Sequence, residues 1–348
     1  FHAISFDEIS YLTKNGYGNT CASITETGNT IPEVILEEVI HKIPVYTAFE
    51  IEGQGTDADG DILTYSWEQM DLGPSGHPNY PSNNAPIFRA FSPSESPLRV
   101  FPRMYDILNN TQTKGELIPE YARTLNFRLT VRDNRAGGGG LAFAETQVEV
   151  TEQAGPFEVI YPNGNETWGI NTNYPVTWQV EDTDDGAVNS PYVNIILLHN
   201  TNGNWEETIL AENEENDGEA EVSIPNIDEL IGSQNRIKIK PTNNIFFDIS
   251  NDDFAITAMS ISEISQGKVE IYPNPSNSEF NIRMTNLGKN NLGLIVLDIS
   301  GKIIHQETID TSSGNFTHKM HLKNVSKGTY FLKLSTDKEQ AIQIISIL

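Results

Sequence analysis

The chain has 348 residues and is poor in cysteine, in positive charge and in long apolar runs. Its one cysteine, Cys21, excludes a fold held together by internal disulfides. Lys and Arg number 22 against 48 Asp and Glu, which gives a formal net charge of −26. So acidic a surface repels nucleic acids and anionic membranes, and we predict no nucleic acid as a partner. No run approaches the roughly 18 consecutive apolar residues of a membrane-spanning helix, so we predict no such segment.

The motifs of common catalytic sites are also absent from the sequence. It has no His-Glu-x-x-His, no Gly-x-Ser-x-Gly and no Gly-x-x-x-x-Gly-Lys. His318 and His321 are three residues apart in a predicted strand, so their side chains point to opposite faces and we expect no shared zinc. The four glycines at 137–140 open no helix, so we interpret them as a hairpin tip rather than a phosphate-binding loop. We therefore expect no catalytic centre in this chain.

What the sequence does contain is a long series of short, alternating runs rich in Val, Ile, Phe, Tyr and Thr. Such runs are typical of antiparallel sheets with one solvated face. The first series comprises residues 45–53, 62–70, 125–133 and 144–152, and two further series follow it. The chain is too long for one ordinary core. We predict an all-β fold of three tandem antiparallel sandwiches, immunoglobulin-like or fibronectin-like, after a short N-terminal helix.

Changes in pattern and charge give the domain boundaries. Nine Lys and Arg stand against seven Asp and Glu in residues 267–348, a net charge of +2, whereas residues 1–266 carry −28. The predicted parts are a helix with its exit loop at 1–32, a cadherin-like or immunoglobulin-like sandwich at 33–153, a second sandwich at 154–258, a linker at 259–267 and a third sandwich at 268–348. The first sandwich carries a proline-rich insertion at 73–122, which we expect to pack through Phe88, Phe91, Phe101 and Tyr105.

The first twelve residues, FHAISFDEISYL, have the pattern of an amphipathic helix. Ile4, Ile9 and Leu12 lie near helical spacing, with Asp7 on the other side. A single helix followed only by strands has nothing of its own to pack against, so we expect it to remain from an upstream domain. The unpaired Cys21 is consistent with a partner outside this region, and a simple thiol is the alternative.

The stretch GTDADGDILTYSW at 55–67 is the best candidate for a metal site. Asp57, Asp59 and Asp61 alternate around Gly60, so their carboxylates can converge on one side of a tight turn. Calcium takes six to eight oxygen ligands, and short Asp-rich loops supply them. Asp133 is a candidate ligand from a neighbouring loop. The alternative is an Asp-Gly hairpin turn with solvated acids.

Four tryptophans raise the alternative of a carbohydrate platform. Trp67, Trp168 and Trp178 alternate so that they face a sandwich core, and Trp205 does not. We therefore predict core packing for the first three. A multidomain surface adhesin or carbohydrate-binding protein remains the second hypothesis for the chain.

Residues 1–258 resemble the region that follows the catalytic domain in secreted bacterial reprolysin-like zinc metallopeptidases. The resemblance lies in TDADGDILTYSWEQMD, RTLNFRLTVRDN and AGPFEVIYPNGNETWGINTNYPVTWQVEDT, in this order. It implies that FHAISFDEISYL corresponds to the last helix of the protease domain. The zinc-binding histidines of that family lie upstream of this helix, so the resemblance implies Zn²⁺ only in the upstream domain and no catalytic residue here.

Residues 268–348 resemble the type A C-terminal sorting domain of proteins exported by the type IX secretion system of Bacteroidota. The resemblance lies in YPNPSNSEFNI, VLDISGKII and KNVSKGTYFLKL. Pro273 and Pro275 end the preceding strand, and Asn274 is expected to bond within the turn. The resemblance implies recognition by the secretion machinery through Tyr272, Pro273, Asn274, Pro275, Asp298, Gly301, Lys302, Lys327, Gly328 and Tyr330.

Together the two resemblances give the expected function. The chain is expected to be a secreted or cell-surface cargo of the type IX secretion system, exported across the outer membrane. Its expected partners are the outer-membrane translocon, the barrel-shaped shuttle protein of that system and the protein's own upstream protease domain. The acidic sandwiches are expected to support that protease domain.

Overall fold

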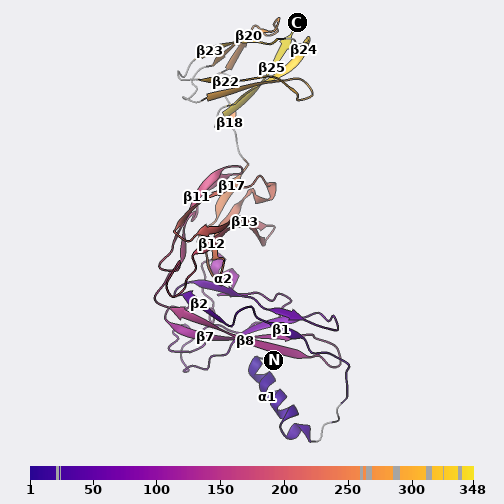
Figure 1. The fold of residues 1–348 in the computed structure, drawn as a ribbon, viewed down its shortest axis with the longest axis vertical. Helices are drawn as coiled ribbons and strands as arrows, with labels where there is room; N and C mark the ends of the chain where they lie inside the picture. The colour runs from indigo at the N-terminus through magenta and orange to yellow at the C-terminus, as the bar shows by residue number, and fades with distance from the viewer. Residues whose placement is uncertain are drawn as a thin grey trace. The chain divides into compact units, whose positions relative to one another are not determined.

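A computed structural model describes residues 1–20, 23, 25–258, 262–263, 269–284, 291–310, 316–323, 325–335 and 339–348. The chain forms two compact units, Phe1–Ala258 and Met259–Leu348. Strands dominate both units (Figure 1), so the predicted all-β class is confirmed. Cys21 and most of the predicted linker lie outside the described residues.

A four-stranded sheet forms one end of the first unit. Its order is β2-β8-β7-β5, where β2 is Ile40–Pro44, β8 is Leu141–Thr151, β7 is Arg123–Arg132 and β5 is Thr64–Gln69. The pairs β8–β7 and β7–β5 are antiparallel, whereas β2 runs parallel to β8. A small pair, β1 (Glu33–Ile35) and β4 (Gln54–Thr56), leads into the acidic turn before β5.

A larger sheet continues the first unit across the predicted boundary at residues 153 and 154. Its strands are β3 (Ala48–Ile51), β6 (Arg99–Phe101), β10 (Thr167–Gly169), β12 (Tyr192–Thr201), β13 (Asn204–Glu215), β15 (Gly232–Pro241), β16 (Phe246–Ile249) and β17 (Phe254–Thr257). Strand β3 pairs with β16, which places Phe49 opposite Phe246. A three-stranded sheet of β9 (Glu158–Tyr161), β11 (Asn173–Gln179) and β14 (Glu219–Ser223) completes the unit. One hydrophobic core runs through these sheets, and the predicted boundary itself stays a prediction.

The proline-rich insertion contributes aromatic rings to this core, although fewer than expected. Phe88 and Phe101 are buried, with ring centroids 4.8 Å apart, and β6 and the short helix α2 (Met104–Leu108) belong to the same stretch. The prediction for Phe91 and Tyr105 is wrong, because these side chains are 39 % and 62 % exposed. Each instead lies against an arginine, with the Arg99 guanidinium 4.5 Å from the Phe91 ring and that of Arg103 beside Tyr105.

The predicted N-terminal helix is present as α1 (Ala3–Lys14), and a short 3₁₀ turn, η1 (Tyr17–Asn19), follows it. The helix does have contacts within the unit, contrary to expectation. Ala3 donates its N–H to the carboxylate of Glu68 on β5 at 2.7 Å. Asp7 pairs with Arg128 on β7 at 2.8 Å. Several apolar side chains of the helix nevertheless remain exposed, namely Ile4, Ile9, Tyr11 and Leu12.

The second unit is a sandwich of a five-stranded and a three-stranded sheet. The larger sheet has the order β18-β25-β24-β21-β22, at Ser262–Glu263, Glu339–Ile347, Gly328–Ser335, Asn291–Leu297 and Ile303–Asp310. The smaller sheet has the order β19-β20-β23, at Val269–Tyr272, Glu279–Met284 and Phe316–His321. Alternate residues of these strands, such as Phe280, Leu294 and Leu332, form a separate core between the two sheets.

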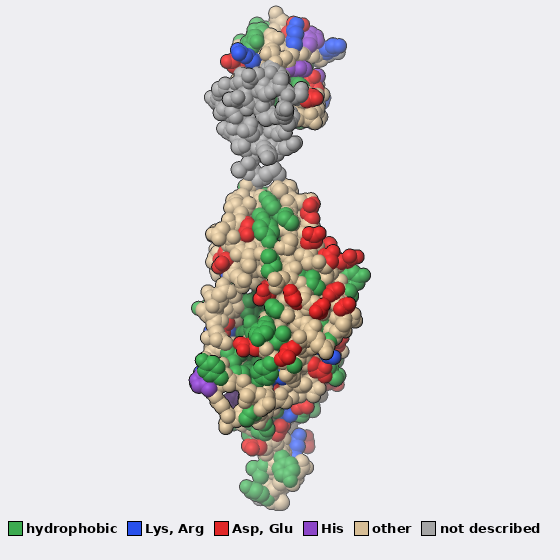
Figure 2. Space-filling model, turned by 90° about the vertical axis from the view of Figure 1, so that its left-hand side faces the viewer, with side chains coloured by type: hydrophobic (Ala, Val, Ile, Leu, Met, Phe, Trp, Pro, Cys, Tyr) green, Lys and Arg blue, Asp and Glu red, His purple; other side chains and the backbone are tan. Residues whose placement is uncertain are grey.

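A buried network of ion pairs connects the two predicted sandwiches of the first unit. Most carboxylates of this acidic unit are not buried, and on the face that Figure 2 shows, red side chains outnumber blue ones. Glu50 on β3 is instead 7 % exposed and pairs with Lys238 at 3.0 Å and Lys240 at 2.6 Å, both on β15. Glu207 on β13 pairs with Lys238 at 2.9 Å. Burial alone would raise the pKa of Glu50, but the two lysines outweigh it and hold the pKa below the ordinary value of 4.5.

Replacing Glu50 by Gln is predicted to destabilise the first unit in a pH-dependent way. Its folded pKa is depressed, so its contribution is present above the ordinary value of 4.5 and lost as the pH falls through the lower folded value. Near neutral pH we expect a loss of about 3 kcal/mol in the free energy of unfolding, because the buried Lys238 loses one of its two partners. Urea unfolding measured between neutral and acidic pH should show this difference shrinking.

The control is Glu149→Gln, which removes an exposed ion pair with Lys42. It should change the free energy of unfolding by less than about 1 kcal/mol. A loss in Glu50→Gln that stays constant down to acidic pH would contradict the ionic origin of the effect.

Candidate functional site

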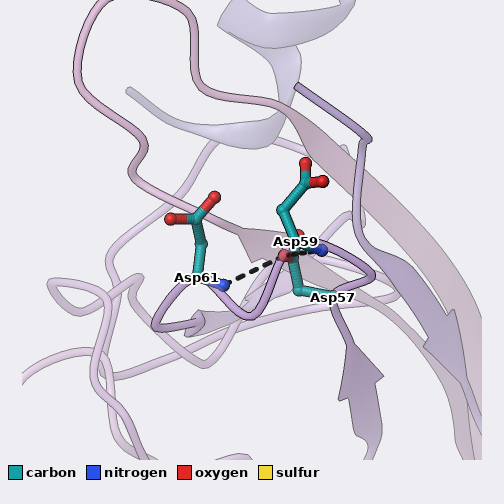
Figure 3. Close-up of side chains that lie close together, drawn as sticks. All are labelled: Asp57, Asp59 and Asp61. Carbon is teal, nitrogen blue, oxygen red and sulfur yellow. Dashed lines mark hydrogen bonds between the residues drawn. The ribbon is translucent and has the colours of Figure 1, made fainter. Parts of the chain in front are cut away.

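The acidic turn between β4 and β5 brings three carboxylates together. One oxygen each of Asp57, Asp59 and Asp61 lies within 4.8 Å of the others. Oδ1 of Asp57 accepts the backbone N–H groups of Asp59 at 2.9 Å and of Asp61 at 3.0 Å, as Figure 3 shows. Gly60 has a φ of +78°, a conformation that favours glycine, so the turn can close tightly. The carboxylates of Asp59 and Asp61 point to the same side of this turn (Figure 3).

The three carboxylates offer oxygen ligands to a metal ion, but the positively charged side chain of Arg135 already lies beside two of them. Among the described residues, Oδ2 of Asp57 and of Asp61 are buried without a hydrogen-bond partner. The guanidinium of Arg135 lies 3.2 Å from Oδ2 of Asp59 and 3.7 Å from Oδ2 of Asp61. Thr30 also donates its N–H to Asp59 at 2.6 Å. The residues therefore fit a hard divalent cation, provided that Arg135 moves aside.

Asp133, the fourth predicted ligand, has hydrogen-bond partners of its own. It is 2 % exposed and accepts the N–H of Gly140 at 2.8 Å and the side-chain amide of Asn29 at 2.6 Å. Burial alone would raise its pKa, but these bonds and the backbone N–H of Arg135 hold the pKa below its ordinary value. It is not one of the three carboxylates that lie within 4.8 Å, so its role as a ligand stays a prediction.

Two further sequence predictions concern histidine and tryptophan. His318 contacts Glu307 at 2.9 Å and His321 contacts Glu279 at 3.5 Å, so the two rings have different carboxylate partners. The predicted burial of tryptophan is confirmed by the exposed fractions, which are 3 %, 1 % and 4 % for Trp67, Trp168 and Trp178.

The proline corner after β19 holds the last strand of the chain. The side-chain amide of Asn274 donates to the carbonyl of Ile344 at 2.7 Å, and its oxygen accepts the N–H of Ser346 at 2.9 Å. The backbone N–H of Ser276 donates to the carbonyl of Ser346 on β25, and the carbonyl of Ser276 accepts the N–H of Leu348, at 2.9 Å each. The expected bond of Asn274 within the turn is thus replaced by bonds to a strand 70 residues away. Tyr272, Pro273 and Pro275 are exposed beside this contact.

The turn between β21 and β22 is fixed by Asp298, as its spacing suggests. The carboxylate of Asp298 accepts the hydroxyl of Ser300 at 2.6 Å, the N–H of Ser300 at 2.8 Å and the N–H of Lys302 at 3.1 Å. These bonds, led by that from the Ser300 hydroxyl, hold the pKa of Asp298 below its ordinary value. Gly301 has a φ of +83°, which favours glycine. The side chain of Lys302 is exposed.

The predicted residues at the start of β24 have two different positions. Lys327 and Gly328 are exposed where the strand begins. Tyr330 is 7 % exposed, and its hydroxyl donates to the carbonyl of Ser326 at 2.8 Å. The tyrosine is therefore part of the core, whereas Lys327 is available to a partner.

The comparison with known families concerns this second unit. Residues 270–347 match the secretion system C-terminal sorting domain. The matched segment runs from β19 through β25 and includes the proline corner and the Asp298 turn. The sorting domain supports export through the type IX secretion system to the cell surface or the extracellular space. Among the described residues, none of the helices has the length and apolar character to cross a membrane.

The comparisons with curated proteins and with solved structures add no evidence about function. No curated protein matches the chain at a significant level. Among solved structures, the FN1–FN3 domains of chicken CNTN1 are 10 % identical, with 91 % of this chain and 98 % of that chain covered and a TM-score of 0.24. The Bacteroides ovatus protein SGBP-B, solved with a mixed-linkage heptasaccharide, is 15 % identical, with 93 % of this chain and 71 % of that chain covered and a TM-score of 0.19. Likenesses this low carry no argument about function.

Replacing Asn274 by Ala is predicted to loosen β25 in the sorting domain. Two hydrogen bonds to the strand are lost, which should cost about 1 to 3 kcal/mol of local stability. Hydrogen exchange of the Ser346 amide should become faster by at least about tenfold. The matched control is Asn277→Ala, an exposed asparagine three residues further on. Equal exchange rates in the two variants would show that the side chain of Asn274 does not hold β25.

Proposed function

We propose that the chain is the accessory and sorting region of a metallopeptidase exported by the type IX secretion system. Residues 268–348 would dock on the outer-membrane translocon and on its barrel-shaped shuttle protein. The first unit would support a zinc-dependent protease domain located upstream, and no catalytic residue is assigned to this chain. The match of residues 270–347 to the sorting domain is the observation that carries this proposal.

The protease parent is supported by two weaker observations. The motifs of residues 1–258 resemble the region that follows the catalytic domain in reprolysin-like metallopeptidases. In addition, α1 is attached to the first unit mainly through Ala3 and Asp7, whereas Ile4 and Tyr11 are 55 % and 66 % exposed. An apolar helix surface of this kind is suited to packing against a further domain.

The alternative of a carbohydrate-binding adhesin has less support. It rested on the four tryptophans and on the repeated sandwiches, and three of the tryptophans are buried. Stacking on a sugar requires an exposed ring face, so these three side chains cannot provide the platform. We therefore retain export as the proposed function.

Deleting residues 269–348 is predicted to abolish export. The chain, brought to the periplasm by an added signal peptide in a host with a type IX system, should appear outside the cell only when these residues are present. The exported fraction, measured by immunoblotting of cells and medium, should fall by at least about tenfold. The first unit should keep its melting transition, because it has a core of its own. Export of the truncated chain at the normal level would contradict the proposal.

We further propose that Asp57, Asp59 and Asp61 bind calcium. Three carboxylate oxygens that lie within 4.8 Å of one another can contribute three of the six to eight ligands that calcium takes. Oδ2 of Asp57 and Oδ2 of Asp61 are buried and without a hydrogen-bond partner in the described part of the chain, and a cation would satisfy both. Arg135 competes with the cation for two of the three side chains.

Replacing Arg135 by Ala is predicted to strengthen calcium binding. The guanidinium no longer has to be displaced, so the affinity measured by calorimetry should rise by about tenfold. Asp57→Asn should weaken binding, because a carboxylate that faces the cation loses its charge. Calcium should also raise the melting temperature of the natural chain and of Arg135→Ala. Absence of heat and of stabilisation in both proteins would rule out the site.

A further inference from the structure

The outer face of the five-stranded sheet in the second unit carries an apolar row. In the register of the sheet, Ile344 on β25 lies opposite Phe331 on β24. Phe331 lies opposite Leu297 on β21, and Leu297 lies opposite Ile303 on β22. The register of β21 and β22 shifts between Val296 and Leu297, but Ile304 packs against the core and its neighbour Ile303 is exposed, so all four side chains lie on the outer side of the sheet. Ile344 is 59 % exposed and Ile303 is 54 % exposed, so the row faces solvent.

A second row lies two residues further along the same face. It joins Ile342 on β25, Lys333 on β24, Ile295 on β21 and the exposed polar Gln306 on β22. Ile342 is 59 % exposed, and Lys333 and Ile295 are half-buried. Lys333 is thus the charged side chain within the two rows. We call the residues of both rows the apolar face.

The outer face of the three-stranded sheet in the same unit carries charged side chains that form ion pairs. There Glu270 faces Arg283 across β19 and β20, with an ion pair at 3.5 Å. Glu279 on β20 pairs with Lys319 on β23 at 3.0 Å. An antiparallel sheet that faces water usually alternates in this way between apolar and polar residues.

Two strands of the apolar face, β21 and β25, do not alternate in this way, whereas β24 does. The runs NLGLIVL of β21 and QAIQIISI of β25 are apolar on both sides, a pattern that is typical of strands covered on both faces. The inner residues of these strands, such as Leu294 and Ile345, are fully buried in the core. The outer residues Ile295 and Ile342 therefore have no role in that core, and a covering partner accounts for them.

We propose that the apolar face is the surface through which the sorting domain docks on a component of the type IX secretion machinery. This inference rests on the proposed function, and it specifies which face of the sorting domain the secretion machinery recognises. The face belongs entirely to residues 295–344, within the segment that matches the sorting domain. The partner surface is apolar and carries a carboxylate opposite Lys333.

A second copy of the chain fits this face less well. Two copies packed face to face around a two-fold axis would use the same patch on each side. Lys333 lies in the middle of its row, between Ile342 and Ile295, so such packing would bring two lysines close together without a counter-charge. Like charges in a desolvated interface are unfavourable, whereas a partner with a carboxylate there would gain an ion pair.

The test uses export of the full chain, with the added signal peptide and the same host. The double variant Ile342→Ser, Ile344→Ser removes two exposed apolar side chains, and Lys333→Glu reverses the charge. Each should reduce the exported fraction by about tenfold, since a buried isoleucine contributes a tenfold change in affinity or more. The matched controls are Arg283→Ser and Lys319→Glu, at exposed side chains on the opposite sheet. Both controls should be exported normally.

A photo-crosslinking residue at position 344 provides a readout that does not depend on export. It should trap a component of the secretion machinery, and the same residue at position 319 on the opposite sheet should not. Unchanged melting transitions will show that the variants fold, which is expected because Ile342 and Ile344 are exposed and Lys333 is only half-buried.

The outcomes separate the two proposals. If the chain without residues 269–348 is exported like the intact chain, the proposed function fails. If that deletion blocks export but both face variants are exported like their controls, the apolar face is not the docking surface, although the cargo assignment stands. If the purified chain forms a dimer in sedimentation and Ile342→Ser, Ile344→Ser disperses it, the face belongs to a second copy and the inference is overturned.

Discussion

The second unit depends on how its last strand is held. Asn274 and Ser276, which follow β19, bond to the backbone of Ile344, Ser346 and Leu348. The first and last segments of the sorting domain therefore support each other. This contact keeps β25 in register with β24, and the register in turn aligns Ile344 with Phe331, Leu297 and Ile303. The prolines around Asn274 fix the backbone that presents its amide, so the corner is a structural support for the neighbouring surface.

The first unit follows a different constraint. Its two predicted sandwiches share a sheet through β3 and β16, and Glu50 and Lys238 are buried close to that pairing, with the half-buried Lys240 beside them. A buried charge that loses its oppositely charged partner strongly destabilises the folded protein. The two halves are therefore connected by backbone bonds, by apolar packing and by charge at the same place. The acidic residues elsewhere on the surface keep the unit soluble, while the nearly neutral sorting domain is free to make apolar contacts.

Local features were predictable from the sequence, and pairings across long distances were not. The strands, the helix α1, the Asp298 turn and the burial of three tryptophans follow from spacing, because periodicity reports which side of an element is apolar. Periodicity does not report which strand lies next to another. The parallel pairing of β2 with β8, the sheet shared by β3 and β16 and the bonds from Asn274 to β25 were therefore missed. Arg135 was missed for a related reason: its charge is visible beside Asp133, but its approach to Asp59 depends on the folding of two separate loops.

The attachment of α1 has a consequence for conditions outside the cell. The helix is joined to β7 through Asp7 and Arg128, and the side chain of Asp7 is 40 % exposed. An ion pair that water can reach is screened by dissolved salt, over a Debye length of about 8 Å at physiological ionic strength and about 3 Å at 1 M. In dilute media the helix is therefore held more firmly against the sheet than in brine. The orientation of anything connected to its N-terminal end would then depend on the salinity of the surroundings.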